Sequence, residues 1–353
     1  MIDSDELAAW LRLLETPGVG RDGARRLLAT YGSPQAVLAA KVLAPAPGTL
    51  PALLDSTLAW LAADEHHQVV TLGDPAYPRS LLETADPPLL LYVNGRVELL
   101  GTDSIAIVGS RSATRQGLDN ARSFAAQLSH AGFTIVSGLA LGIDAAAHEG
   151  GLEGAGSTVA VVGTGLDSAY PTRNRTLAGR IAERGLLVSE YSLGSPPLQA
   201  HFPQRNRIIA SLARATLVVE AAPQSGSLIT ARLANESGRD VFAIPGSIHS
   251  PQSRGCHALI KQGAKLVESV ADILEELRPG AAAPMLRRPS TTAEPPANDP
   301  VLEALGFDPI TVDALAERTG WPPSDLNIHL LELELDGRIA RLPGQRFQRI
   351  ARA

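Results

Sequence analysis

The sequence predicts an α/β fold in which a mostly parallel sheet is wound on both faces by helices. Seven short apolar runs rich in β-branched residues recur from residue 104 onward, and segments of helix length separate them. Continuous apolar runs are typical of parallel strands that are buried on both faces, and ligands of such folds bind where the strands end. The predicted strands are residues 105–108, 134–136, 158–162, 187–189, 216–219, 241–244 and 265–267.

Composition limits the kinds of function that this chain can have. Of its 353 residues, 44% are hydrophobic and 19% are charged, which is typical of a globular protein. The net charge of −6 excludes binding to nucleic acid through overall basicity, so any site for a polyanion must be local. Cys256 is the single cysteine, which excludes an intrachain disulfide framework and a thiolate zinc site. We expect no metal and no cofactor.

The chain shows no signal for export or for a membrane. No basic and then apolar leader opens the sequence, and no apolar run approaches the roughly 18 residues that a membrane span needs. We therefore expect a cytoplasmic protein that does not contact a membrane.

Residues 1–65 are expected to form a small helical domain. A helical pattern that starts with Ser4 as its N-cap stops at the sequence TPGVG of residues 16–20, and an arginine-rich helix follows. This arrangement is similar to a helix-hairpin-helix or SAM-like unit, in which amides at a helix N-terminus approach a nucleic-acid phosphate. An ordinary tight turn between two helices is the alternative. A further helix is expected over residues 53–65.

Residues 66–279 are expected to form the α/β domain, which two edge strands at residues 69–72 and 89–93 extend. A flexible linker should follow over residues 280–299, because this stretch is rich in proline, alanine, serine and threonine. The linker separates the α/β domain from a smaller C-terminal domain.

Residues 300–353 show the order helix, turn, helix and strand pair, which predicts a winged-helix domain. Its second helix carries Asp325, Glu332 and Glu334 but no lysine or arginine, so DNA phosphates would repel it. We expect a protein contact or a structural role for this domain instead of DNA reading.

Arginines are concentrated in three windows that follow predicted strand ends. Residues 104–118, 168–180 and 199–214 contain no aspartate or glutamate, although the whole chain is acidic. The carboxyl ends of parallel strands meet at one edge of a sheet, so these windows predict an anion site at that edge. Solvated helix faces are the alternative. The arginines in these windows are Arg111, Arg115, Arg173, Arg175, Arg180, Arg205, Arg207 and Arg214.

Motifs for other chemistries are incomplete or absent. The sequence GTG at residues 163–165 follows a strand, but Ser168 stands where a dinucleotide fingerprint has its third glycine, which disfavours a nicotinamide site. No Walker-type sequence occurs, so we expect no ATP hydrolysis. Asp144 and His148 share a helix face, which fits a catalytic base or a structural pair. Without a nucleophile or a metal constellation, the structural interpretation is favoured.

Six ordered sequence blocks together resemble the DprA/Smf family of DNA-processing proteins. Within residues 79–279, the blocks are IAIVGSR from Ile105, SGLALGIDAAAH from Ser137, GLDSAYPTRN from Gly165, FPQRNRIIA from Phe202, EAAPQSGSLITA from Glu220 and PGSIHSPQSRGCHALI from Pro245. The resemblance implies a Rossmann-like homodimer that binds single-stranded DNA, protects incoming strands and loads RecA onto them for homologous recombination in natural transformation. It implies no enzymatic activity. This chain has His257 where the family usually has asparagine, so we assign no role to that position.

We expect single-stranded DNA to lie across the carboxyl edge of the sheet, with Phe202 as a stacking surface for a base. Arg111 and either Arg205 or Arg207 are expected to pair with phosphates. Amides that follow the glycines of the site should add hydrogen bonds at helix N-termini. Sequence preference should be weak, and affinity for double-stranded DNA stays open. The expected DNA-binding residues are Gly109, Ser110, Arg111, Arg115, Gly138, Arg175, Phe202, Arg205, Asn206, Arg207, Ser225 and Gly226.

Two other classes of function stay open. A nucleotide-processing enzyme of the related phosphoribohydrolase type would need a carboxylate base, for which Glu190 and Glu220 are the candidates at strand ends. Those enzymes carry the block P-G-G-x-G-T-x-x-E, whereas this chain reads PQSGSLITA from Pro223 and lacks the double glycine and the glutamate. A scaffold that binds only proteins is the other alternative. Dimerisation is expected to use the far edge of the sheet, beyond Val241.

Overall fold

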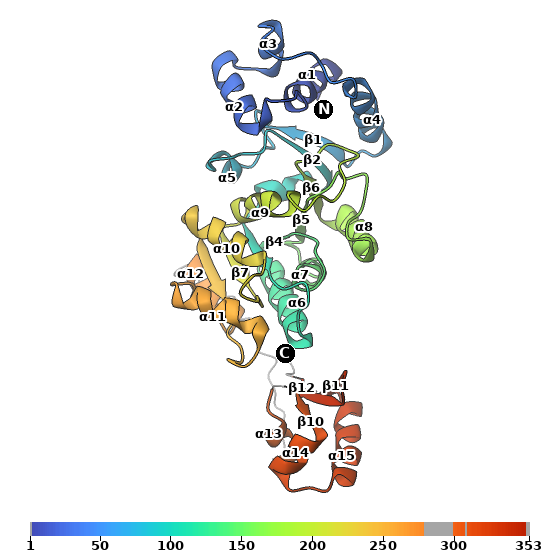
Figure 1. Cartoon of the computed structure of the whole chain (residues 1–353), viewed down its shortest axis with the longest axis vertical. Helices are drawn as coiled ribbons and strands as arrows, with labels where there is room; N and C mark the ends of the chain where they lie inside the picture. Colours follow the sequence, from blue (N-terminus) through green and yellow to red (C-terminus); the bar gives the residue numbers. More distant parts are fainter. Residues whose placement is uncertain (1, 279–298, 308, 351–353) are drawn as a thin grey trace. The chain divides into compact units, whose positions relative to one another are not determined.

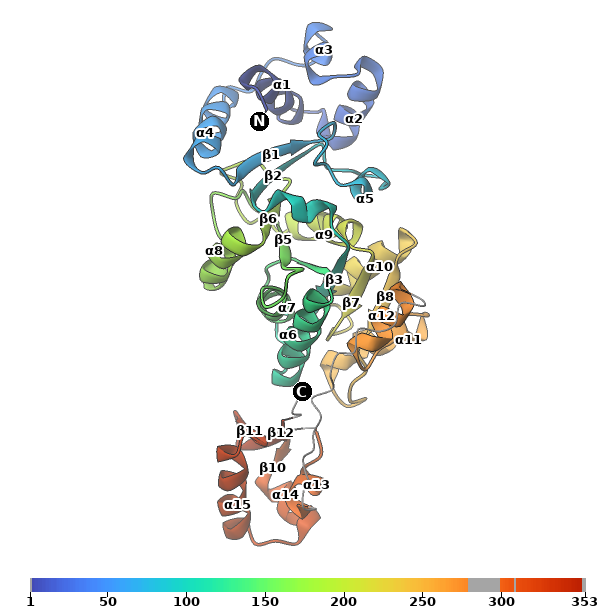
Figure 2. The same cartoon turned by 180° about the vertical axis from the view of Figure 1, so that it is seen from behind.

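The computed structural model of the chain describes residues 2–278, 299–307 and 309–350. Two compact units are present, residues 1–277 and residues 278–353, and Figures 1 and 2 show their elements from two sides. Apart from its last residue, the predicted linker lies outside the described residues. Across the described parts of the chain, no helix is both long enough and apolar enough to cross a membrane.

The first unit is built on a nine-stranded sheet with the order β1–β2–β6–β5–β4–β3–β7–β8–β9. Strands β3 to β9 run parallel to one another, whereas β2 is antiparallel to both of its neighbours, β1 and β6. The predicted strands are all present, with shifts of one or two residues at their ends. They are β1 (His67–Thr71), β2 (Leu90–Gly95), β3 (Ser104–Val108), β4 (Thr134–Ser137), β5 (Thr158–Val162), β6 (Leu186–Ser189), β7 (Ala215–Val218), β8 (Asp240–Ala243) and β9 (Lys265–Leu266).

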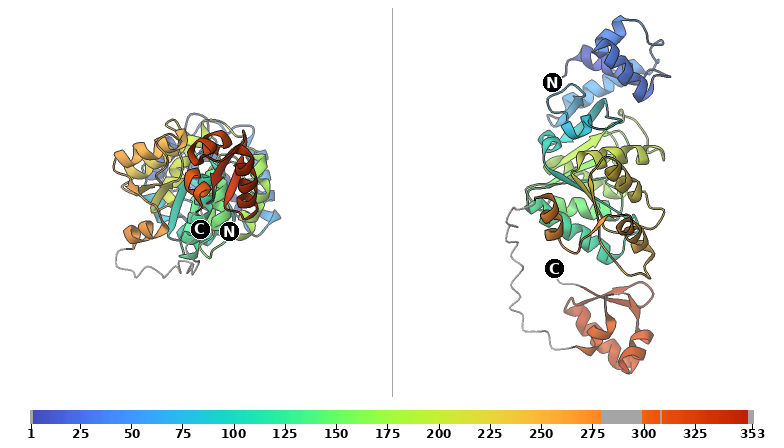
Figure 3. Two further views of the ribbon diagram at one scale, coloured as in Figure 1. Left: turned by 90° about the horizontal axis from the view of Figure 1, so that it is seen from below. Right: turned by 90° about the vertical axis from the view of Figure 1, so that its left-hand side faces the viewer.

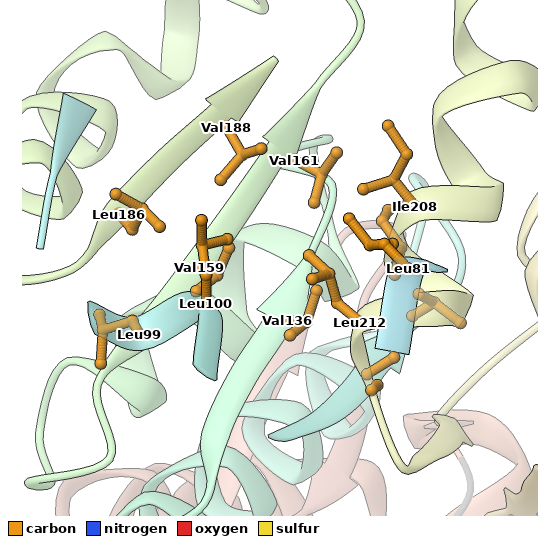
Figure 4. Close-up of a cluster of buried hydrophobic side chains, with 14 of the residues drawn as sticks. Leu81, Leu99, Leu100, Val136, Val159, Val161, Leu186, Val188, Ile208 and Leu212 are labelled. Carbon is orange, nitrogen blue, oxygen red and sulfur yellow. The ribbon is translucent and has the colours of Figure 1, made fainter. Parts of the chain in front are cut away.

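Helices cover both faces of this sheet. On one face, Ile208 and Leu212 of α9 pack with strand residues such as Val136 and Val161 (Figure 4). On the other face, Phe124 of α6 belongs to a separate apolar cluster with α7 and α12. The strands are apolar throughout because both faces are buried, and the predicted doubly wound, mostly parallel α/β fold is confirmed. The helices are α5 (Arg79–Leu82), α6 (Arg115–His130), α7 (Ile143–Gly151), α8 (Arg175–Arg184), α9 (His201–Leu212), α10 (Ser227–Glu236), α11 (Arg254–Lys261) and α12 (Val270–Leu277), with 3₁₀ turns at Val97–Gly101, Thr172–Asn174 and Pro251–Ser253.

Four helices precede the sheet and pack onto its first two strands. Trp10 of the first helix shares an apolar core with Tyr92 of β2. The N-cap of that helix is Asp3, whose carboxylate accepts a hydrogen bond of 2.7 Å from the amide of Glu6. The prediction of Ser4 as N-cap is therefore wrong by one residue, since Ser4 is already the first helical residue. The four helices are α1 (Ser4–Leu14), α2 (Gly20–Tyr31), α3 (Pro34–Ala39) and α4 (Leu50–Ala63).

The second unit has the predicted order of helices followed by a strand pair (Figure 3, red). Its three-stranded sheet has the order β10–β12–β11, and Leu315, Leu330 and Phe347 lie in its own apolar core. The acidic residues noted in the sequence lie on α15. The elements are α13 (Pro300–Leu305), β10 (Ile310–Thr311), α14 (Val312–Thr319), α15 (Pro323–Leu335), β11 (Ile339–Leu342) and β12 (Arg346–Arg349).

Candidate nucleic-acid interface

A groove of about 830 Å³ lies where strands β3 and β7 end, and helix α9 contributes to its lining. These two strands pair side by side, with Val108 opposite Val218, so the loops that follow them lie together. The groove is lined mainly by these loops and by the first turns of α9 and α10, and Tyr170 joins them from the loop after β5. Eight of the twelve residues predicted from the sequence line it: Gly109, Ser110, Arg111, Phe202, Arg205, Asn206, Ser225 and Gly226.

An exposed arginine and two aromatic rings lie next to one another in this groove. The guanidinium carbon of Arg111 lies 5.5 Å from the centroid of the Phe202 ring, and the ring of Tyr170 lies 5.7 Å from that of Phe202. A cation beside two π-faces suits the phosphates and the unpaired bases of a polynucleotide. Tyr170 was not among the predicted residues. Its place in the acid-free stretch 168–180 was the signal that could have found it.

Arg205 lies in the floor of the groove and is only 4% exposed. Its Nη2 donates to the carbonyl oxygen of Gly138 at 2.8 Å, and its Nε has no hydrogen-bond partner among the described residues. Burial lowers the pKa of Arg205, and the neighbouring Asp144 carboxylate opposes this shift. The placement departs from the expected direct pairing of Arg205 with a phosphate, because most of the guanidinium is covered by the fold. Arg205 can still contribute positive potential from below.

The loop after β4 is closed by acceptors from helix α7. The Asp144 carboxylate accepts from the amides of Gly138 at 3.2 Å and of Ala140 at 3.3 Å, and Nε2 of His148 accepts from the amide of Leu139 at 3.2 Å. The expectation that amides after Gly138 bind phosphate is therefore wrong, since the chain itself uses them. This geometry supports the structural interpretation of Asp144 and His148.

The first amides after the other two glycines of the site are also used within the chain. After Gly109, the amide of Ser110 donates to the backbone oxygen of Glu220 at 2.7 Å. After Gly226, the amide of Ser227 donates to Oγ of Ser225 at 3.3 Å. The expected phosphate contacts by these two amides are thus not available. Gly109 is needed for close packing instead, because a Cβ atom there would lie 2.8 Å from the same backbone oxygen.

The two carboxylates that could serve as an enzymatic base are held elsewhere. Glu220 accepts from the amide of Thr114 at 2.9 Å and from its hydroxyl at 2.5 Å, next to the N-terminus of α6. Glu190 forms ion pairs with Arg21 and Arg207. Neither glutamate is among the residues that line the groove. This arrangement disfavours the phosphoribohydrolase alternative.

Arg207 does not line the groove and belongs to a separate ion-pair cluster. Its Nε lies 2.8 Å from Asp86, and its Nη2 pairs with Glu190. Arg21 lies 3.3 Å from Asp86 and 3.1 Å from Glu190, and Arg25 also pairs with Asp86. We call these five residues the Arg207 cluster. It corrects the expectation that Arg207 faces DNA, and it favours the ordinary turn over a helix-hairpin-helix site, because Arg21 and Arg25 of α2 already have carboxylate partners.

Arg115 and Arg175, the remaining predicted arginines, lie outside the lining of the groove. Arg115 is exposed at the start of α6 and pairs with Asp119 at 3.3 Å, while Arg175 is exposed at the start of α8. An exposed pair of this kind contributes at most about 1 kcal/mol, so Arg115 can exchange its partner readily.

Acidic conditions should destabilise the protein through His148. Its Nδ1 contacts the hydroxyl of Thr158 at 2.7 Å, and burial, assisted by the charge of Arg205, lowers its pKa from 6.5 to about 3. Between these two values the unfolded chain binds a proton that the folded chain does not, so the free energy of unfolding falls as the pH falls. We expect a loss of roughly 3 kcal/mol from this group between pH 7 and pH 4.5. Urea unfolding at both pH values should show a shallower pH dependence for His148→Gln than for the wild type.

The fold and the groove define a Rossmann-like α/β protein whose basic and aromatic side chains meet at the carboxyl edge of the sheet. The chain belongs to the family described as DNA recombination-mediator protein A, whose sequence profile matches residues 68–278. Residues 285–345 match the DprA winged helix domain. The resemblance stated from the six sequence blocks is thereby confirmed.

Relatives and solved structures extend this likeness over most of the chain. Protein Smf from Escherichia coli K12 is 43% identical over 307 residues, which cover 85% of this chain and 82% of that protein. The X-ray structure of DNA processing protein A from Streptococcus pneumoniae has a TM-score of 0.65 and 37% identity, and the match covers 78% of this chain and 98% of that one. A structure of DNA processing protein A from Helicobacter pylori, which addresses the single-stranded DNA binding mode of that protein, has a TM-score of 0.55 and 32% identity, and covers 60% and 96% of the two chains.

Proposed function

We propose that this protein binds single-stranded DNA in the groove after β3 and β7, protects incoming strands and loads RecA onto them for homologous recombination in natural transformation. The observation that carries the proposal is the juxtaposition of Arg111, Phe202 and Tyr170 in one groove of a chain whose net charge is −6. Membership of a recombination-mediator family and the DNA-binding mode studied in the Helicobacter pylori protein support it. The cytoplasm is the compartment where such strands would meet RecA.

The geometry suits a single strand better than a duplex. Arg111 is exposed and can pair with a phosphate, while Phe202 and Tyr170 offer faces on which unpaired bases stack, each worth about 1 to 3 kcal/mol. Bases in a duplex are already stacked and cannot use these rings. Ser110 and Asn206 line the same groove and can add polar contacts. Because ring stacking tolerates every base, sequence preference should be weak.

The other predicted residues take different parts in the proposal. Arg205 and Gly138 support the groove from below, and Arg115 and Arg175 are exposed cations outside it that a longer strand could reach. Arg207 has no contact with DNA in this proposal, since its guanidinium is paired with two carboxylates.

Arg111→Ala should weaken binding of a labelled oligothymidine and flatten its salt dependence by about 0.7 in the log–log slope, because one phosphate contact is lost. Fluorescence anisotropy at several salt concentrations measures both effects, and the RecA strand-exchange rate on the same oligonucleotide should fall with the affinity. Arg96→Ala is the matched control. Arg96 pairs with Glu98 at 2.9 Å, and its amide bonds to Gly185 just before β6, at the opposite end of the parallel strands. An unchanged slope for Arg111→Ala would remove Arg111 from the site.

The proposal includes a homodimer formed at the β9 edge of the sheet. Strand β9 is the outermost strand on that side, and Leu266 within it is 44% exposed. An exposed apolar side chain on an open strand edge favours association with a second copy.

A further inference from the structure

A second groove, of about 820 Å³, lies beside β1, which is the outermost strand at the other edge of the sheet. We call it the β1 groove. Trp10 of α1 and residues of α2 and α3 line it on the side of the N-terminal helices, and Val69 and Thr71 line it on the side of the strand. Figure 1 shows β1 beneath these helices.

Backbone groups of β1 face this groove without partners. In an antiparallel pair, alternate residues bond to the neighbouring strand and the residues between them face away. Leu72 donates to Leu89 beside β2, so the even-numbered residues of β1 pair with β2. The N–H and C=O of Val69 and the N–H of Thr71 therefore face the open edge, and no described residue is hydrogen-bonded to them.

The residues that carry these backbone groups are largely covered. Val69 is 7% exposed and Thr71 is 6% exposed, so the open edge forms the floor of the groove. Trp10 is 5% exposed, and its indole Nε1 also lacks a hydrogen-bond partner among the described residues. A buried N–H without a partner costs about 1 to 3 kcal/mol and is rare in folded proteins. A ligand that offers alternating carbonyl and N–H groups would satisfy this edge, and an extended polypeptide does so.

The charge of the β1 groove defines the kind of polypeptide. Glu6, Asp64, Glu65 and Asp74 line it, and its described lining residues include no lysine or arginine. Four carboxylates would repel a polynucleotide. A second copy of this chain, paired edge to edge, would bring two acidic rims together. A segment that carries lysine or arginine would instead meet complementary charge.

We propose that the β1 groove binds an extended, basic segment of a partner protein, which pairs with β1 as an added strand. Val69 supplies the central pair of backbone hydrogen bonds, Thr71 supplies a further donor, and the carboxylates hold the basic side chains. The groove shares no lining residue with the groove proposed for DNA. Both ligands can therefore be bound at once, and this proposal stands or falls independently of DNA binding.

Fluorescence anisotropy with a labelled eight-residue peptide of alternating lysine and valine tests the proposal on the full chain. We expect this peptide to bind at least about tenfold more tightly than the same peptide with glutamate in place of lysine. Two further probes are N-methylated on all lysine amides or on all valine amides, which leaves the charge unchanged. Only the probe whose methyl groups face β1 should lose binding. Equal binding of the lysine and glutamate peptides, or undiminished binding of both methylated probes, would overturn the proposal.

Variants of the protein provide the second test. Glu65→Lys should weaken binding of the lysine–valine peptide by about three- to tenfold. Glu183→Lys should leave this binding unchanged, because Glu183 is exposed and lies outside the groove. Oligothymidine binding should be the same for both variants. A loss of self-association on addition of the peptide, measured by sedimentation, would show that a second copy occupies the groove and would contradict the proposal.

Discussion

Gly138→Ala should remove most of the affinity for single-stranded DNA and also destabilise the fold. A Cβ atom at this position would lie 1.4 Å from Nη1 of Arg205 and 2.2 Å from its guanidinium carbon, so the arginine must leave its place. Asp144, which is 7% exposed, would then be left without the nearby positive charge. The displaced arginine also loses its hydrogen bond to the carbonyl oxygen of Gly138, and a buried polar group left without its partner costs about 1 to 3 kcal/mol. We expect the free energy of unfolding, measured with urea, to fall by this amount. We also expect at least about a tenfold loss of oligothymidine affinity, which corresponds to about 1.4 kcal/mol of binding free energy.

Gly179→Ala is the matched control for this substitution. Gly179 lies within α8, and a Cβ atom there would meet nothing within 4 Å. Alanine should stabilise that helix by up to about 1 kcal/mol and leave DNA binding unchanged. Adding Arg205→Ala to Gly138→Ala should cause little further loss, because the arginine is already displaced. Additive effects of the two changes would show that Gly138→Ala does not act by displacing Arg205.

The strands of this fold could be predicted because each one is a local, continuously apolar segment. The order of the strands could not, because β6 is inserted between β2 and β5 by contacts that no local pattern encodes. The general position of the groove followed from the rule that parallel strands end at one edge. The identity of its arginines was harder to predict. Arg205 and Arg207 are two residues apart on a helix, so their side chains point about 200° apart and cannot both face the groove.

The glycine-rich loops show a second limit of sequence reasoning. Each loop offers amides near a strand end, as a phosphate site would, but acceptors elsewhere in the chain already use several of them. His148 lies nine residues from Leu139, and Glu220 lies 110 residues from Ser110 in the sequence. Such pairings depend on the tertiary structure. Tyr170 was missed for a related reason, because its contact with Phe202 joins a loop to helix α9, which lies about 30 residues further along the sequence.

Arg207→Ala should destabilise the protein by about 1 to 3 kcal/mol, because two largely buried carboxylates each lose one hydrogen-bonding partner, while changing DNA affinity by less than about threefold. The side chain of Glu190 is only 8% exposed, and removal of Arg207 leaves it with Arg21 as its remaining ion-pair partner. Asp86 would lose one of three arginines. Because α2 and α9 are joined through these carboxylates, the loss should also loosen the contact between the N-terminal helices and α9. Urea unfolding and oligothymidine anisotropy on the folded variant separate the two effects.

The comparison that decides the role of Arg207 is with Arg214→Ala. Arg214 also pairs with a carboxylate, at 3.2 Å from Asp103, but both side chains are about half exposed. An exposed pair contributes at most about 1 kcal/mol, so Arg214→Ala should change stability less than Arg207→Ala. A normal unfolding curve for Arg207→Ala, together with a salt slope flattened by about 0.7, would instead assign Arg207 to a phosphate contact. The Arg207–Glu190 pair is buried, whereas the Arg214–Asp103 pair is half exposed. Equal destabilisation by both variants would therefore mean that burial of Glu190 does not increase the contribution of its ion pair to the free energy of unfolding.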